Sequence, residues 1–160
     1  MTRKITRYAL FLIFSVALSY IEGFLPAIFI PGVKIGLSNL APLYLLIKDD
    51  YFGAAITNFV RILLSALLFS GASGLIFSFC GFLLSYAVMF ILHKLKFHTA
   101  AVSVAGGTCH NLGQILASLL FFPAAVLYYL PPALLLGAAA GLIMGLLCEI
   151  IIKKLPEKIN

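Results

Sequence analysis

The sequence predicts an all-α integral membrane protein, a single domain over residues 1–160 built as a bundle of six transmembrane helices. Two features of the composition predict this class, because 63% of the residues are apolar and 10% are charged, whereas soluble domains are about half apolar and a quarter charged. The third feature is the length of the chain, because 160 residues are enough for six spans of ~20 residues with short connections. The formal charge of +6 lies at segment ends rather than on one basic face, so the expected partner is the bilayer and not nucleic acid.

The expected spans are separated by turn residues and short polar segments. They cover residues 8–29, 35–47, 51–69, 75–92, 99–122 and 133–152. Proline and glycine residues follow the first span, and aspartates in the turn at 48–50 favour the start of the third helix. The SGASG stretch at 70–74 separates the third span from the fourth, and the segment at 123–132 connects the fifth to the sixth.

The second expected span is too short to cross a bilayer as a helix. Its 13 residues, 35–47, rise only ~20 Å, less than the ~30 Å of the hydrocarbon core, and include Gly36 and Pro42. We therefore expect it to be unwound at one end or to enter from an edge covered by protein. Such short spans often mark transporter binding sites. The alternative is a helix that thins the bilayer around itself.

The distribution of basic residues predicts that both termini are cytoplasmic. With the N-terminus inside, the inner segments hold nine of the eleven Lys and Arg residues, Lys34 lies outside, and Arg61 lies within the membrane. The inner bases are Arg3, Lys4, Arg7, Lys48, Lys94, Lys96, Lys153, Lys154 and Lys158.

Arg61 is the most informative polar residue. An arginine at the middle of a span costs at least ~2.5–3.5 kcal/mol on insertion scales, so it is expected to be paired or to line a wet cavity. Glu22 is the carboxylate at comparable depth, and we hypothesise a Glu22–Arg61 pair or an anionic ligand shared on Arg61. In the alternative, Arg61 caps carbonyls of a broken second span. Lys34 and Asn39 flank the outer end of that span, and Lys34 either covers the site or is simply solvated.

The fifth span carries the densest polar cluster, AGGTCHNLGQ at 105–114. His110, Asn111 and Gln114 share one helical face, which should look into the protein because lipid leaves polar groups unsatisfied. No catalytic residue, metal ligand or cofactor is expected, because no nucleophile–base or ligand spacing occurs. The expected substrate-binding residues are Glu22, Lys34, Asn39, Asn58, Arg61, His110, Asn111 and Gln114.

Small residues predict close helix contacts in two spans. Ser15 and Ser19 form a small-xxx-small pair in the first, and Gly137, Gly141 and Gly145 form two successive GxxxG units in the sixth. Whether the neighbour of the glycine face lies in this chain or in another subunit is left open. The three cysteines lie in separate apolar segments and are read as inert buried thiols.

Four motifs carry a family resemblance: GVKIGLSNLAPL at 32–43, NFVRILLS at 58–65, FCGFLLS at 79–85 and GGTCHNLGQ at 106–114. They resemble the Gx transporter family, also called heptaprenyl diphosphate synthase component I. That family is similar in size and topology to the substrate-binding S components of energy-coupling-factor (ECF) importers, with six helices and both termini inside. The resemblance implies that Ser15 and Ser19 form a surface that docks onto a coupling subunit, although alanines are usual there.

Two functions are expected. In the first, the chain is the substrate-binding subunit of an ECF-type small-molecule importer in a bacterial cytoplasmic membrane, and separate ATPases drive it because the chain has no GxxxxGK[ST] motif. In the second, implied by the synthase name, it is a membrane component of isoprenoid or menaquinone biosynthesis that scaffolds a prenyl synthase or binds a prenyl lipid. An aqueous outward-opening pocket would favour the first function, and a greasy lateral opening beside Arg61 would favour the second. Whether the chain is itself an enzyme stays open.

Overall fold

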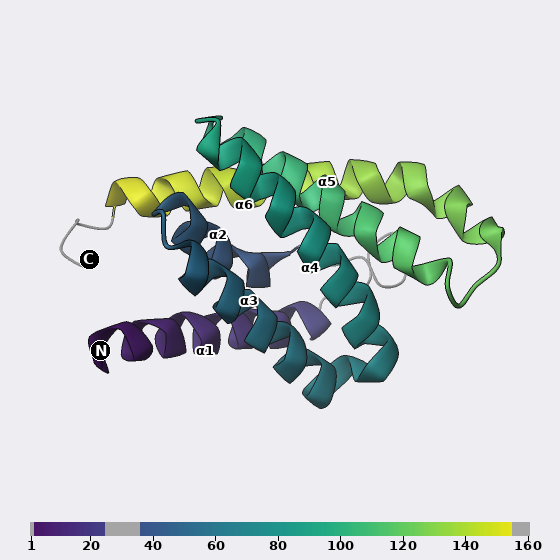
Figure 1. Cartoon of the computed structure of the whole chain (residues 1–160), viewed down its shortest axis with the longest axis horizontal. Coiled ribbons are helices and arrows are strands. Elements are labelled where there is room, and N and C mark those ends of the chain that lie inside the picture. Colours follow the sequence, from purple (N-terminus) through teal and green to yellow (C-terminus); the bar gives the residue numbers. More distant parts are fainter. Residues whose placement is uncertain (1, 25–35, 155–160) are drawn as a thin grey trace.

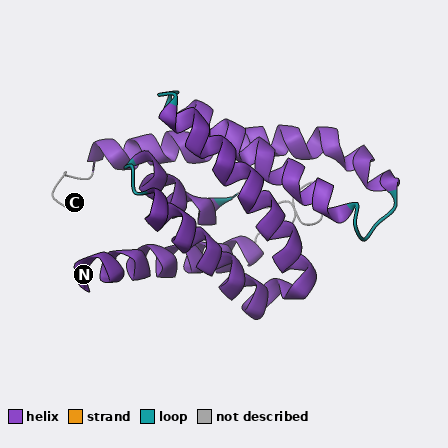
Figure 2. Ribbon diagram, in the orientation of Figure 1, coloured by secondary structure: helices purple, strands orange, loops and turns teal. Residues whose placement is uncertain are grey.

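The computed structural model describes residues 2–24 and 36–154, which are helical apart from short turns (Figure 2). In chain order the elements are α1 (Thr2–Phe24), η1 (Leu37–Asn39), α2 (Leu40–Ile47), α3 (Tyr51–Ser65), η2 (Ala66–Ser70), α4 (Gly71–Lys94), α5 (Thr99–Ser118), η3 (Ala124–Tyr129) and α6 (Leu130–Lys154). The elements η1 and η3 are 3₁₀ helices, and η2 is a π-helix that continues α3. No strand forms within these two ranges, which confirms the predicted all-α class.

Four helical segments in the described part of the chain are long and apolar enough to cross a membrane. They are Lys4–Glu22, Tyr51–Leu68, Gly71–Lys94 and Ala124–Lys154. The segment Leu37–Ile47 is apolar but short. With 20 residues α5 rises about 30 Å, but its polar side chains reduce its hydropathy. The six α-helices agree with the number of helices predicted. Two of them, α2 and α5, are not among the four long apolar segments, and both pack against neighbouring helices.

The packing explains how α5 tolerates polar residues. It lies between α4 and α6 and packs along both, whereas α1 packs against α3 and η1 (Figure 1). The short α2 contacts α1, α3 and α6. The start of α1, the end of α6, the α2–α3 turn and the α4–α5 turn all lie toward one end of the molecule (Figure 1). The chain thus returns to this end after every second helix, as it must if both termini are cytoplasmic. Which end faces the cytoplasm stays a prediction from the distribution of charge.

Carboxylates tie helices together at this end. Asp50 caps α3 by accepting a backbone N–H of its first turn at 3.0 Å. The same carboxylate accepts from Tyr8 Oη at 2.9 Å and pairs with Arg7, which fixes α1 against α3. Glu149 of α6 accepts from the backbone N–H of Ala100 at 3.2 Å in the first turn of α5. Each carboxylate stabilises a helix N-terminus, where the dipole favours negative charge.

Asp49, in the same α2–α3 turn, is held by the next helices. Tyr51 Oη donates to its carboxylate, and His93 Nε2 of α4 lies 3.2 Å from Oδ1. The hydrogen bond from Tyr51, with a smaller contribution from His93, lowers the pKa of Asp49 from its ordinary value. The carboxylate therefore stays ionised at neutral pH and ties the turn to α4.

The short second helix is enclosed by protein. Gly36 precedes η1 with φ +83°, a conformation that glycine adopts without strain, and η1 leads directly into α2. Most of the α2 side chains are buried, namely Leu40, Ala41, Pro42, Leu43, Leu45 and Leu46. Neighbouring helices cover this segment, as expected for a chain that enters from a protein-covered edge, so a thinned bilayer is not needed to explain it.

The glycine face of α6 packs on α5 of the same chain. A Cβ added at Gly107 would lie 2.2 Å from Gly137 O, and one at Gly137 would lie 2.5 Å from Gly107 O. A Cβ at Gly141 would lie 2.4 Å from Ser103 O, and Gly145 extends the contact toward the start of α5. The backbones thus approach within distances that only glycine permits, and the question left open by the GxxxG pattern is answered.

We predict that Gly107→Ala lowers the free energy of unfolding by about 1–3 kcal/mol, because the new methyl group meets the rigid Gly137 carbonyl. The neighbouring Gly106→Ala is the matched control. Its Cβ would meet the flexible Met89 side chain, which can move aside. Unfolding followed by circular dichroism in detergent measures both variants, and equal losses would contradict the rigid contact between α5 and α6.

Candidate functional site

Arg61 is buried in the bundle, 8% exposed, and is bound by neutral oxygen atoms. Its Nε donates to Asn58 Oδ1 at 3.0 Å, and Nη2 donates to the same oxygen at 2.6 Å and to Asn39 Oδ1 at 3.0 Å. Nη1 donates to Ser38 Oγ at 2.9 Å. Since Asn58 precedes Arg61 by one turn of α3 and the other two acceptors lie in η1, the guanidinium fixes η1 against α3.

Glu22, 5% exposed, supports the same segment from the side of α1. Its Oε1 accepts from the Leu37 N–H at 2.8 Å and its Oε2 from the Ser38 N–H at 3.3 Å. Of the ion pairs formed by the described residues, none joins Glu22 to Arg61. The hypothesised direct pair is replaced by an indirect one in which both charges bind Ser38. The carboxylate also lies at the start of η1, where free N–H groups favour an anion.

The serines of α1 are buried inside the chain. Ser15 is fully buried and its Oγ donates to Ser38 O at 3.0 Å, while Ser19 is 5% exposed. The backbone N–H, the carbonyl and the hydroxyl of Ser38 are thus all hydrogen-bonded. This geometry favours helix packing within the chain over the docking of a partner on these two serines.

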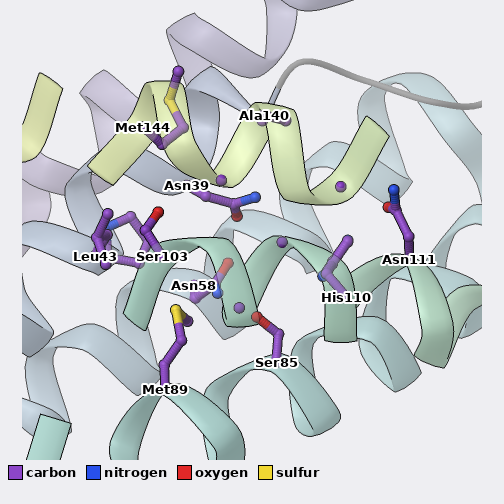
Figure 3. A pocket seen from close by; sticks show the side chains of 16 residues that line it. Asn39, Leu43, Asn58, Ser85, Met89, Ser103, His110, Asn111, Ala140 and Met144 are labelled. Atoms are coloured by element: carbon purple, nitrogen blue, oxygen red, sulfur yellow. The ribbon is translucent and has the colours of Figure 1, made fainter. Parts of the chain in front are cut away.

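A cavity of about 70 Å³ adjoins the Arg61 cluster (Figure 3). One water needs ~10–15 Å³ measured in this way, so the cavity admits several waters or a small ligand. Its polar side chains are all amides, hydroxyls or imidazole, namely Asn39, Asn58, Ser85, Ser103, His110 and Asn111. Glycines of α5 and α6 line it as well.

Half of the expected binding residues line this cavity. Asn39 and Asn58 come from η1 and α3, and His110 and Asn111 from α5 (Figure 3). Asn111 is fixed because its Nδ2 donates to Ala133 O at 2.7 Å.

The other expected residues lie elsewhere. Arg61 lies behind the two asparagines that it binds and is not part of the lining, and Glu22 holds η1. Gln114 is half-buried and does not line the cavity, because three residues of α5 beyond Asn111 carry it past the cavity's end. Lys34 lies outside the described residues.

Three serines of the site escaped the sequence-based prediction. Ser38 is the acceptor that joins Glu22 to Arg61, and Ser85 and Ser103 line the cavity. Single serines in apolar helices commonly bond to their own backbone, so their type carried no signal. The position of Ser38, next to Asn39 in the short span, was the one available hint.

The chemistry of the site is hydrogen bonding. His110 is the single titratable side chain in the lining, and its ring packs against Gly81, where an added Cβ would come within 3.0 Å of two ring atoms. In the described part of the chain, no group of three or more His, Cys, Asp or Glu residues is placed to hold a metal ion. The cavity is thus lined by hydrogen-bonding side chains, and the amides of Asn39, Asn58 and Asn111 are held in place by their neighbours.

We predict that Glu22→Gln lowers the free energy of unfolding by about 1.5–3 kcal/mol, because one of two buried charge-assisted hydrogen bonds is replaced by a clash between two donors. Asp49→Asn is the control, since the Asp49 side chain is 74% exposed and its interactions are expected to contribute less than about 1 kcal/mol. Denaturant titration in detergent compares the two. Equal stability of Glu22→Gln and the unmodified chain would show that η1 does not depend on the carboxylate.

Comparison with known proteins adds the family. A family model described as heptaprenyl diphosphate synthase component I matches residues 11–151, a range that takes in all the residues lining the cavity. No curated protein matches the chain, and no solved structure does. Because the family match covers most of the sequence, the chain belongs to the heptaprenyl diphosphate synthase component I family.

Proposed function

We propose that this protein is a ligand-binding membrane subunit that takes up a small, hydrogen-bonding molecule in the cavity between η1, α2, α3, α4, α5 and α6. The observation that carries the proposal is the lining. Polar side chains from four elements converge on one cavity in a bundle where each isolated polar group would be costly. Hydrogen bonds to Arg61 and Ala133 hold three of these side chains in position, so little ordering is needed when a ligand binds.

As an importer subunit, the chain would act as the substrate-binding component of an ECF-type system in a bacterial cytoplasmic membrane. The short, protein-covered α2 helix beside the cavity supports this function, since interrupted spans recur at transporter binding sites. The ATPases and the coupling subunit would be separate chains. With Ser15 and Ser19 covered by η1 and α3, the coupling subunit would contact another face of α1.

Family membership favours a second function, in which the chain supports prenyl diphosphate synthesis at the membrane. The placement of Arg61 bears on how it would do so. A diphosphate group is bound best by exposed cations, whereas four hydrogen bonds to neutral acceptors occupy this guanidinium behind Asn39 and Asn58. This supports a scaffold for a prenyl synthase subunit rather than a cavity that holds the diphosphate itself.

Native mass spectrometry of the purified protein tests ligand binding. We predict a co-purified small molecule that is lost from Ala140→Leu, whose added side chain fills the cavity that Ala140 lines. Ala139→Leu is the matched control, because Ala139 is exposed on the outer face of α6 and its substitution leaves the cavity unchanged. The same bound mass on both variants, or on neither the variants nor the unmodified chain, would rule out the cavity as the site.

Affinity purification tests the scaffold function. If the second function holds, the chain co-elutes with the soluble prenyl synthase subunit expressed beside it, and Ala140→Leu co-elutes equally well because its change lies inside the bundle. Formation of prenyl diphosphate by the eluted complex provides the activity readout. Absence of the synthase from the eluate in both cases would leave the ligand-binding function alone.

A further inference from the structure

The bonds to Arg61 fix which way two cavity amides point. A guanidinium only donates hydrogen bonds, so the oxygen atoms of Asn39 and Asn58 must face it, as the distances of 3.0 Å and 2.6 Å from Nη2 require. The Nδ2 groups of both residues therefore face away from Arg61. Both side chains line the cavity (Figure 3). The hydrogen bonds of these two side chains within the described residues involve Oδ1 and not Nδ2.

The charge of Arg61 strengthens these two donors. An amide whose oxygen is bound to a cation is polarised, so its N–H groups become better donors, and the low dielectric of the bundle increases the effect. The guanidinium itself stays behind the amides, and Glu22 lies on the far side of Ser38. The cavity thus presents N–H groups rather than a bare positive charge at the end formed by η1 and α3.

The opposite end of the cavity has the reverse polarity. Asn111 donates its Nδ2 to Ala133 O, and a carbonyl only accepts, so Asn111 Oδ1 is the free atom of that amide. Within the described residues no donor bonds to this oxygen. Donors from η1 and α3 and an acceptor from α5 therefore line the same space.

We infer that the cavity selects a small molecule that carries a carbonyl-type oxygen, bound by Asn39 Nδ2 and Asn58 Nδ2, with an N–H or O–H group toward Asn111 Oδ1. This deepens, and rests on, the proposed ligand-binding function. Amides, lactams and carboxylic acids in their protonated form belong to the class so defined. Amines without an oxygen acceptor lack the group that Asn39 and Asn58 bind.

The test uses two neutral probes of similar size, 2-pyrrolidinone and pyrrole, in equilibrium dialysis against the full chain in lipid nanodiscs, with empty nanodiscs as the blank. Both carry an N–H group, but only the lactam supplies the oxygen acceptor. We expect the unmodified chain to bind 2-pyrrolidinone at least about tenfold more tightly than pyrrole, the ratio that one hydrogen bond of moderate strength contributes.

Asn58→Asp separates the two roles of Asn58, in which Nδ2 donates into the cavity and Oδ1 accepts from Arg61. The carboxylate still accepts from Arg61 and so preserves the melting temperature, but it removes the N–H group from the cavity. We expect it to weaken 2-pyrrolidinone binding at least about tenfold and to shift the preference toward pyrrole. Asn58→Ala, which also loses the acceptor, is expected to lower the melting temperature. Phe52→Leu, at a position on the same helix that is 72% exposed and outside the lining, is expected to change neither binding nor melting.

Three results would overturn the inference: equal binding of the two probes to the unmodified chain, binding of neither, or unchanged lactam binding by Asn58→Asp. Each leaves the proposed function separately testable, because the co-purified mass and its loss in Ala140→Leu do not depend on either probe. A co-purified molecule without an oxygen acceptor would likewise overturn the inference while supporting ligand binding.

Discussion

The start of the short second helix imposes the constraint on which the rest of the structure depends. A helix that begins inside the bundle exposes backbone N–H groups where lipid offers no hydrogen bonds. Three neighbours satisfy this segment: Glu22 accepts its first N–H groups, Ser15 binds a carbonyl, and Arg61 binds its side chains. Because these residues come from α1 and α3, the satisfaction of η1 also positions both helices around α2. Two opposite charges near one serine keep the buried cluster close to neutral.

A second constraint acts on the other side of the molecule, where α5 carries more polar groups than lipid would tolerate. Its place between α4 and α6 shields these groups, and glycines on α6 allow the backbones to meet. Three of the glycines in this contact, Gly107, Gly137 and Gly141, also line the cavity. The close contact between α5 and α6 thus forms part of the cavity wall.

The two constraints meet at the cavity and give it its chemistry. Arg61 stabilises η1 and at the same time orients Asn39 and Asn58, so the residue that holds the fold also sets the polarity of the lining. Its guanidinium contacts the two amides and is not itself part of the lining. Membership of the component I family is consistent with both proposed functions, a binding subunit and a partner of a prenyl synthase.

Composition and spacing by themselves determined the helical membrane class, the short second helix and the burial of Arg61, because each follows from the cost of polar groups in lipid. They also indicated four of the residues that line the cavity. Only the tertiary structure decided that Ser38 stands between Glu22 and Arg61, that α5 is the neighbour of the glycine face, and that Gln114 lies away from the lining. The physical reason is that helical periodicity gives the face on which a residue lies, whereas its partner is set by how far and at what angle separate helices pack.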